Sequence, residues 1–176
     1  GFVKDTQFSV DRGFFTEPFM LQISSKTPGA TIRYTTNGSE PTASVGNIYK
    51  GPIKISKTAM IRAAAFKENH FATNIDTHTY LFLYDIYNQQ TAADWPTSGV
   101  NGQSLNYGMD PDITSRYTTE EMIDALSAIP SISIVTEQKN LTSSGQGIYV
   151  NAQQHGRSWE RSSSFEIIDS KKIKSD

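Results

Sequence analysis

Cysteine is absent from this chain of 176 residues, which excludes a disulfide framework, a thiolate zinc site and a cysteine nucleophile. No apolar run approaches the ~20 residues that a membrane-spanning helix requires. An excess of basic residues is also missing, since 16 Lys and Arg face 18 Asp and Glu. Binding to phosphate groups needs a concentrated basic face. We therefore expect neither nucleic acid nor a membrane as a partner, and nothing in the sequence calls for a cofactor.

The one basic cluster is Lys171-Lys172-Ile173-Lys174, near the C-terminus. A short run of like charges is most simply a solvated tail.

Residues 1–82 alternate apolar and polar side chains in several short runs, at 19–24, 31–35, 58–66 and 76–83. Such runs, bounded by Pro-Gly, Asn-Gly and Gly-Pro, are typical of short antiparallel strands. Five or six strands within about 80 residues predict a small sandwich. The fold class is therefore mainly β: an immunoglobulin-like antiparallel β-sandwich with an irregular strap and a small α/β extension.

The stretch "ATIRYTTNGSEPT", residues 30–42, contains the clearest turn signal. Asn37-Gly38 supplies the positive φ angles of a tight turn at little steric cost. Pro41 cannot donate a hydrogen bond to a neighbouring strand, so the chain must leave the sheet near this residue. We expect a strand, a reversal with positive φ at Gly38, and a loop.

Residues 83–117 lose the alternation and are rich in Asn, Gln, Ser, Thr, Gly and Pro. Trp95, Leu105, Tyr107 and Met109 make the stretch too apolar for a solvated linker, so we expect an irregular strap packed on its neighbours.

Residues 118–176 are expected to form one helix and several strands. Thr118 and Glu121 match a capping box, and the apolar spacing predicts a helix that Pro130 ends. "SISIV", "GIYV" and "SSSFEIID" are interpreted as strands. We expect the apolar face of the helix to cover the "SISIV" and "FEII" strands.

Three motifs in the first part occur in a familiar order: "TIRYTTNGSEPT", "IYKGPIKI" and "TAMIRAAAFKENHFATNIDTHTY". Residues 13–82 closely resemble the immunoglobulin-like module at the C-terminal end of chitobiases and other glycoside hydrolases. This fibronectin-III-associated module also occurs in large exported bacterial proteins. The resemblance implies a β-sandwich that is an accessory to a neighbouring domain, in a protein that is secreted or at the cell surface.

Residues 95–169, with "LNYGMDPDI", "GIYVN" and "WERSSSFEII", resemble the opening of the CotH-like family of spore-coat-type secretory kinases. The family often has Pro after Trp-Glu-Arg, where this chain has Ser162. The chain also ends where the nucleotide-binding lysine and metal-binding acids of the family would begin. No Gly-rich phosphate loop and no magnesium-binding Asp/Asn pair can be assigned, so no catalytic residue is carried over.

Asp110 and Asp112 flank Pro111, and two carboxylates at this spacing could begin a calcium site. No EF-hand or repeat spacing surrounds them, and Asp-Pro is a common turn former, so a turn is the simpler interpretation.

Trp95, Trp159 and Arg157 are the candidate carbohydrate contacts, because the flat face of an exposed tryptophan can pack on a pyranose ring. Anchoring of each tryptophan's own segment to a core is the simpler alternative.

These observations favour a non-catalytic accessory fragment of an exported bacterial multidomain protein, whose partners are neighbouring domains of a larger parent protein. One alternative is a carbohydrate-binding module of a polysaccharide-degrading system, with a polysaccharide as partner. The other is a truncated CotH-like kinase that lacks its nucleotide site.

Overall fold

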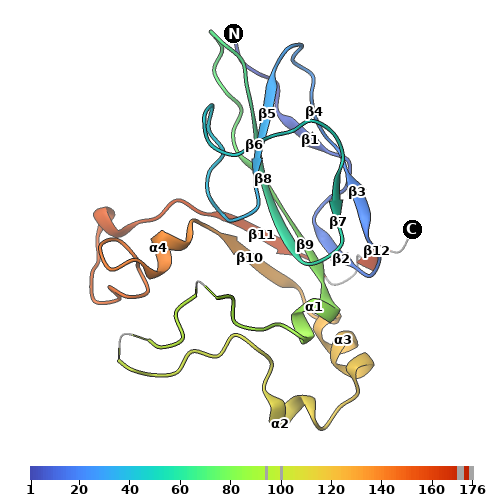
Figure 1. Ribbon diagram of the computed structural model, residues 1–176, viewed down its shortest axis with the longest axis vertical. Helices are drawn as coiled ribbons and strands as arrows, with labels where there is room; N and C mark the ends of the chain where they lie inside the picture. The colour runs from blue at the N-terminus through green and yellow to red at the C-terminus, as the bar shows by residue number, and fades with distance from the viewer. Residues whose placement is uncertain (94, 100, 170–172, 175–176) are drawn as a thin grey trace.

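The computed structural model describes residues 1–93, 95–99, 101–169 and 173–174. Lys171 and Lys172 of the basic cluster therefore lie outside the described residues. The fold is mainly β, with an immunoglobulin-like sandwich at its N-terminal end (Figure 1). None of the described helices is long and apolar enough to cross a membrane.

The sandwich has one large sheet, with strand order β12-β2-β9-β8-β5-β6. Its strands are β2 (Gly13–Phe15), β5 (Thr31–Thr35), β6 (Asn47–Ile48), β8 (Ala59–Phe66), β9 (Asp76–Phe82) and β12 (Ile173–Lys174). The facing layer consists of two strand pairs, β1 with β4 and β3 with β7. These strands are β1 (Thr6–Phe8), β3 (Phe19–Leu21), β4 (Ile23–Ser25) and β7 (Ile53–Ile55).

The core between the two layers follows the predicted alternation. Ile61, Ala63 and Ala65 on β8 are 0–1% exposed, as expected for one face of a strand. On the neighbouring strand, Tyr80 is fully buried, and its hydroxyl donates to the carbonyl oxygen of Val10 at 2.9 Å. Burying side chains of this size contributes about 1.5–3 kcal/mol each.

The sandwich departs from the expected antiparallel pattern at β2, which pairs in parallel with β9 and, on its other side, with β12. The physical reason is that the first strands are divided between the layers. The chain crosses from β1 in one layer to β2 in the other, and β2 then joins the large sheet beside β9.

The reversal at residues 36–46 confirms the predicted turn. β5 ends at Thr35, and Asn37 Oδ1 accepts hydrogen bonds from the backbone N–H and the hydroxyl of Ser39, at 3.1 and 2.7 Å. Gly38 has the predicted positive φ, 79°. The chain then returns to pair β6 with β5.

Strands β10 (Ser131–Val135) and β11 (Ser164–Ile168) form an antiparallel two-stranded ribbon that crosses the outer face of the large sheet (Figure 1). Both strands were predicted. The prediction of a third strand, at "GIYV", is wrong. Residues 147–150 form turns. The N–H of Gly147 donates to the carbonyl four residues before it, and those of Ile148 and Tyr149 donate to carbonyls eight residues before them, all in the segment 140–143.

The helices are short: α1 (Leu83–Tyr87), α2 (Pro111–Thr114), α3 (Thr119–Ser127), α4 (Gln138–Thr142) and the 3-10 helix η1 (Arg157–Trp159). α3 confirms the predicted capping box. Thr118 Oγ1 accepts from the N–H of Glu121 at 3.2 Å, and the Glu121 carboxylate accepts from the N–H of Thr118 at 2.8 Å.

The position of α3 differs from the prediction. Its Ile123 and Leu126 pack against a cluster of Phe14, Leu83 and Ile168, at the end of the sandwich and beside α1. Of the ribbon, only Ile168 belongs to this cluster. The expected cover over the "SISIV" and "FEII" strands is therefore wrong, because α1 and the exposed end of the large sheet compete for the same apolar face.

The irregular stretch also differs from the strap that we expected, since its ends form α1 and α2. Between them, Trp95 packs edge-on against Tyr107, with ring centroids 5.4 Å apart, and the Tyr107 hydroxyl donates to the carbonyl of Pro96. Among the described residues, no hydrogen bond joins the part between α1 and α2 to the sandwich. This part is held mainly by contacts among its own residues.

We predict that Gly38→Ala destabilises the protein more than Gly29→Ala does. Both glycines have a positive φ (79° and 72°), so each substitution carries a backbone cost of about 1–2 kcal/mol. At Gly29 an added Cβ would meet nothing within 4 Å, whereas at Gly38 it would lie 2.4 Å from the carbonyl oxygen of Thr136. Relieving this overlap is expected to add about 1–3 kcal/mol to the loss measured by chemical denaturation.

Equal losses in the two variants would contradict this prediction, because Gly38 would then require only a left-handed backbone and not a close approach to the segment after β10.

Candidate functional site

The most unusual arrangement of chemical groups lies between the large sheet and the ribbon. We call it the polar interface, and it consists of Arg62, Thr77 and Thr79 from the sheet with Ser133, Ser164 and Glu166 from the ribbon. Because β9 turns His78, Tyr80 and Phe82 toward the sandwich core, its two threonines must point to the outer face. Arg62 is the cross-strand partner of Thr77 and lies on that same face.

The polar interface is closed to water on the sheet side. Arg62 is 3% exposed and Glu166 is 2% exposed, while both threonines are buried. Charged groups are almost never buried to this extent unless they are paired. Their hydrogen-bond partners therefore decide how the ribbon lies on the sheet.

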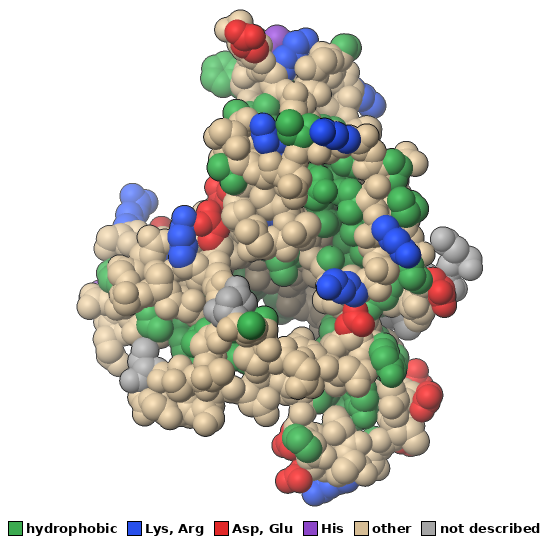
Figure 2. Space-filling model, viewed as in Figure 1, with side chains coloured by type: hydrophobic (Ala, Val, Ile, Leu, Met, Phe, Trp, Pro, Cys, Tyr) green, Lys and Arg blue, Asp and Glu red, His purple; other side chains and the backbone are tan. Residues whose placement is uncertain are grey.

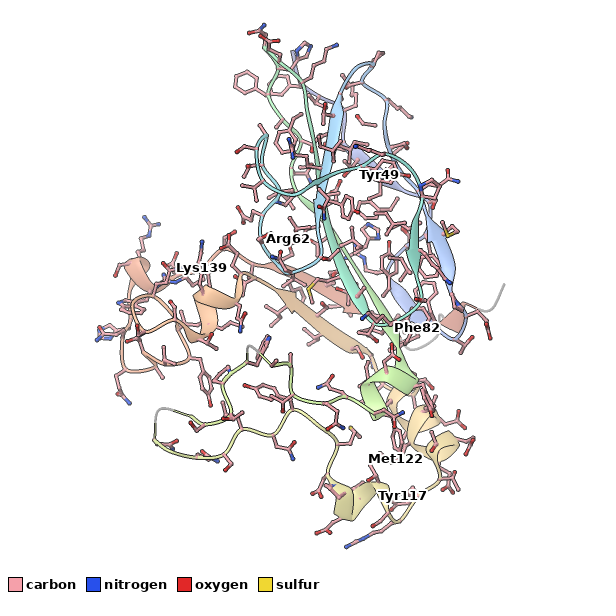
Figure 3. The ribbon with its side chains drawn as sticks, viewed as in Figure 1. Tyr49, Arg62, Phe82, Tyr117, Met122 and Lys139 are labelled. Carbon is pink, nitrogen blue, oxygen red and sulfur yellow. The ribbon has the colours of Figure 1, made fainter. Side chains whose placement is uncertain are left out.

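Arg62 is bound mainly by the loop that follows β5. Its Nη1 donates to the carbonyl of Gly38 at 2.7 Å, and its Nη2 lies 3.5 Å from a carboxylate oxygen of Glu40. The same Glu40 oxygen accepts from the hydroxyl of Ser162 at 2.8 Å, just before β11. Arg62 is thus placed where the "NGSEPT" loop meets the ribbon (Figure 3). Its Nε has no hydrogen-bond partner among the described residues.

Glu166 is bound from the other side of the interface. Its carboxylate accepts from the hydroxyl of Thr79 at 2.5 Å and from the N–H of Thr79 at 3.3 Å. Nη1 of Arg12 lies 3.3 Å from Oε1 of Glu166, and the Arg12 side chain is 40% exposed. Burial raises the pKa of the Glu166 carboxyl, and the hydrogen bonds from Thr79 and the charge of Arg12 offset this rise only in part.

A buried carboxyl with a raised pKa can mark a catalytic site when it faces a cleft. Glu166 faces the hydroxyl-lined sheet instead, and Thr77 and Ser164 close the interface beside it with a 2.7 Å contact between their hydroxyl oxygens. Glu160, the other carboxylate of this segment, is exposed. The arrangement is therefore suited to joining the ribbon to the large sheet. It is not suited to glycoside hydrolysis, which needs two carboxylates on opposite sides of the scissile bond.

The two tryptophans predicted as sugar contacts lie in different surroundings. Trp95 is 37% exposed and packs on Tyr107 within its own segment. Trp159 ends η1 and lines a shallow hollow in the loop between α4 and β11. Arg157 belongs to the same short helix but does not line this hollow. The guanidinium that contacts the Trp159 ring is that of Arg161, 5.2 Å from the ring centroid.

The sequence alone assigned no role to Arg161. It also did not place Asn151, Gln154 and His155 together, although all three line the same hollow. Their common position in a Gly-containing loop just before Trp159 could have indicated this grouping. A loop with turns brings residues that are close in the sequence together in space.

Asp110 and Asp112 lie together, as their spacing implies. Asp110 is the N-cap of α2, and its Oδ1 accepts from the N–H of Asp112 at 2.9 Å. Pro111 at the first helical position favours the same turn. Within the described residues, no group of three or more His, Cys, Asp and Glu side chains could hold a metal ion. The observed bond accounts for the Asp-Pro-Asp pattern through helix capping.

Comparison with known proteins bears on the sandwich. Residues 10–77 match the family model of the chitobiase/beta-hexosaminidase C-terminal domain. The match supports the resemblance stated for residues 13–82, and it ends within β9. Searches of curated proteins and of solved structures found no match. The CotH-like resemblance of residues 95–169 is not supported by any of these comparisons.

We predict that Glu166→Gln stabilises the protein at pH 8 and that this gain shrinks as the pH falls toward 4. A raised pKa means that the folded state favours the protonated carboxyl, so the wild-type protein loses stability as the pH rises through the folded pKa. Glutamine is neutral at every pH and removes this loss. Denaturation at a series of pH values measures the effect.

The matched control is Glu17→Gln, since Glu17 is exposed. The comparison separates the burial of the carboxyl at position 166 from the chemical change of Glu to Gln itself. If Glu166→Gln instead destabilises the protein at pH 8, the charged pair with Arg12 outweighs the burial of the carboxylate.

Proposed function

We propose that this chain is a non-catalytic accessory segment of a larger exported bacterial protein, in which the sandwich supports a neighbouring domain. The family match supports the accessory role, because the matched domain is the C-terminal domain of chitobiase and beta-hexosaminidase. The resemblance to modules of exported bacterial proteins supports a location outside the cytoplasm.

The observation that carries the proposal is the polarity of the ribbon. Its inner face meets the sandwich through Ser133, Ser164 and Glu166, whereas its outer face is apolar. The side chains on that outer face are 60–66% exposed: Ile132, Ile134, Phe165 and Ile167. Ile132 is paired with Ile167, and Ile134 with Phe165, so the four form one continuous patch, the outer apolar face.

A strand pair in water normally turns its apolar side inward. On the ribbon, Val135 and Ile168 are buried on the inner face, but the four apolar side chains named above point outward. A contiguous exposed apolar patch of this kind typically marks an interaction site. We infer that a neighbouring domain of the same polypeptide covers the outer apolar face. In this arrangement, the polar interface holds the ribbon on the sandwich, and the outer apolar face begins the core of the next domain.

The charge distribution on one face of the molecule supports association with protein and not with nucleic acid. Lys and Arg side chains are interspersed with Asp and Glu on the face shown in Figure 2, which has no large patch of one charge. Counterion release from nucleic acid requires several basic groups acting together.

We predict that Val135→Thr destabilises the protein far more than Ile134→Thr does, although the two residues are adjacent. Val135 is 4% exposed and Ile134 is 66% exposed, on opposite faces of β10. Burying a hydroxyl at position 135 should cost about 1–3 kcal/mol, whereas the exposed substitution should change stability by about 0.5 kcal/mol or less. Denaturation of both variants measures this difference.

Ile134→Thr combined with Phe165→Thr should also reduce the fluorescence of a dye that binds exposed apolar surface. A loss of stability in Ile134→Thr as large as that in Val135→Thr would argue that the chain itself already covers the outer apolar face.

We further predict that the purified chain neither transfers phosphate from ATP in the presence of Mg²⁺ nor hydrolyses chromogenic N-acetylglucosaminides. The phosphate and magnesium ligands of a kinase could not be assigned, and Glu166 is buried against Thr79. Labelled ATP and glycoside assays test both reactions. Activity that co-purifies with the chain and is lost in Glu166→Gln would overturn the accessory role.

A further inference from the structure

The loop between α4 and β11 contains a hollow of about 320 Å³. In Figure 1 this loop lies beside α4, away from the sandwich. Trp159, Ile148 and Gly156 form its apolar part, and the polar side chains around them are Asn151, Gln154, His155 and Glu160. The volume is at the lower end of the range for small-ligand sites, about 300–1,000 Å³.

Trp159 is held in place before any ligand arrives. The guanidinium of Arg161 lies 5.2 Å from the ring centroid, close enough for a cation–π contact. That guanidinium is in turn fixed by carbonyl oxygens of three residues, at 2.8–2.9 Å: Gln146, Ser158 and Glu160. The indole therefore presents a surface whose orientation is set by the protein, which lowers the entropic cost of binding.

The polar groups of the hollow are largely unused by the protein. Among the described residues, the side chains of Gln154, His155 and Glu160 make no hydrogen bond. Asn151 donates both amide hydrogens, to the carbonyls of Ser144 and Gly147 at 3.0 and 2.9 Å, which leaves its Oδ1 as an acceptor. The hollow thus offers the amide of Gln154, which can donate and accept, and the imidazole of His155. It also offers two acceptors, Oδ1 of Asn151 and the carboxylate of Glu160.

We propose that this hollow, here called the Trp159 hollow, binds a neutral saccharide. A pyranose has an apolar C–H face that matches an indole ring, and its hydroxyl groups both donate and accept hydrogen bonds. The Glu160 carboxylate disfavours an anionic ligand, and Nε and Nη1 of Arg161 already donate to carbonyl oxygens. The site is independent of the proposed accessory role, since the polar interface and the outer apolar face contribute none of its residues.

The test uses the full chain with four soluble oligosaccharide series, built from β-linked glucose, mannose, xylose or N-acetylglucosamine. Indole N–H signals in ¹H–¹⁵N spectra distinguish Trp159 from Trp95. We expect at least one series to shift the Trp159 signal in a saturable way below about 10 mM, as befits a shallow site. Titration calorimetry then gives the affinity.

Trp159→Ala should weaken binding at least tenfold, and Glu160→Gln should weaken it severalfold. Trp95→Ala is the matched control, because Trp95 lies in another segment, and it should leave the affinity unchanged. Gln154→Ala replaces an exposed side chain and provides a second test if Trp159→Ala fails to fold.

The proposal is overturned if no series shifts the Trp159 signal at about 10 mM, or if the affinity is the same in Trp159→Ala as in the wild-type protein. Either failure would leave the accessory role intact, because the stability and dye-binding tests of the ribbon do not involve this hollow.

Discussion

The burial of Arg62 and Glu166 between the large sheet and the ribbon is the constraint on which the arrangement of the two halves depends. Each charge is removed from water and must therefore find partners in the opposite layer or in the adjoining loops. Arg62 meets the carbonyl of Gly38 and the carboxylate of Glu40, and Glu166 meets Thr79. A shift of the ribbon by one residue would turn Ile167 toward the sheet in place of Glu166. These contacts thus fix the register of the ribbon on the large sheet. The ion pairs of Arg62 with Glu40 and of Glu166 with Arg12 add little net stability by themselves.

This constraint also explains the stretch "NGSEPT". Its turn conformation follows from Asn37 and Gly38 alone, and the sequence predicts it. Its second role depends on distant residues: Gly38 approaches Thr136, and Glu40 contacts both Arg62 and Ser162. A glycine is needed at position 38 for its backbone angle and also because a Cβ would overlap the Thr136 carbonyl. The local pattern gives no indication of that second requirement.

More generally, the features that depend on near neighbours in the chain were predictable. The alternation on β8, the capping box of Thr118 and Glu121, and the turn at Gly38 each involve residues a few positions apart. The features that depend on distant segments were not. "GIYV" has the composition of a strand but finds no partner strand, and α3 packs on α1 instead of the ribbon. At the candidate sugar site, Trp159 was recognisable from the sequence, whereas the contact of Arg161 with its ring was not, because three backbone carbonyls orient that guanidinium.

The polar interface has a further consequence for the order in which the protein folds. Thr79 and Glu166 are separated by 87 residues, and Arg62 and Ser164 by 102. Closing such long loops carries an entropic cost that shorter contacts within the sandwich do not. All described strands of the sandwich except β12 are also synthesised before the ribbon. Until the ribbon arrives, the outer face of β8 and β9 presents hydroxyl groups and a guanidinium to water, and such a face has little tendency to aggregate. A nascent chain can therefore form most of its sandwich before the ribbon, and the β12 strand that follows it, have been synthesised.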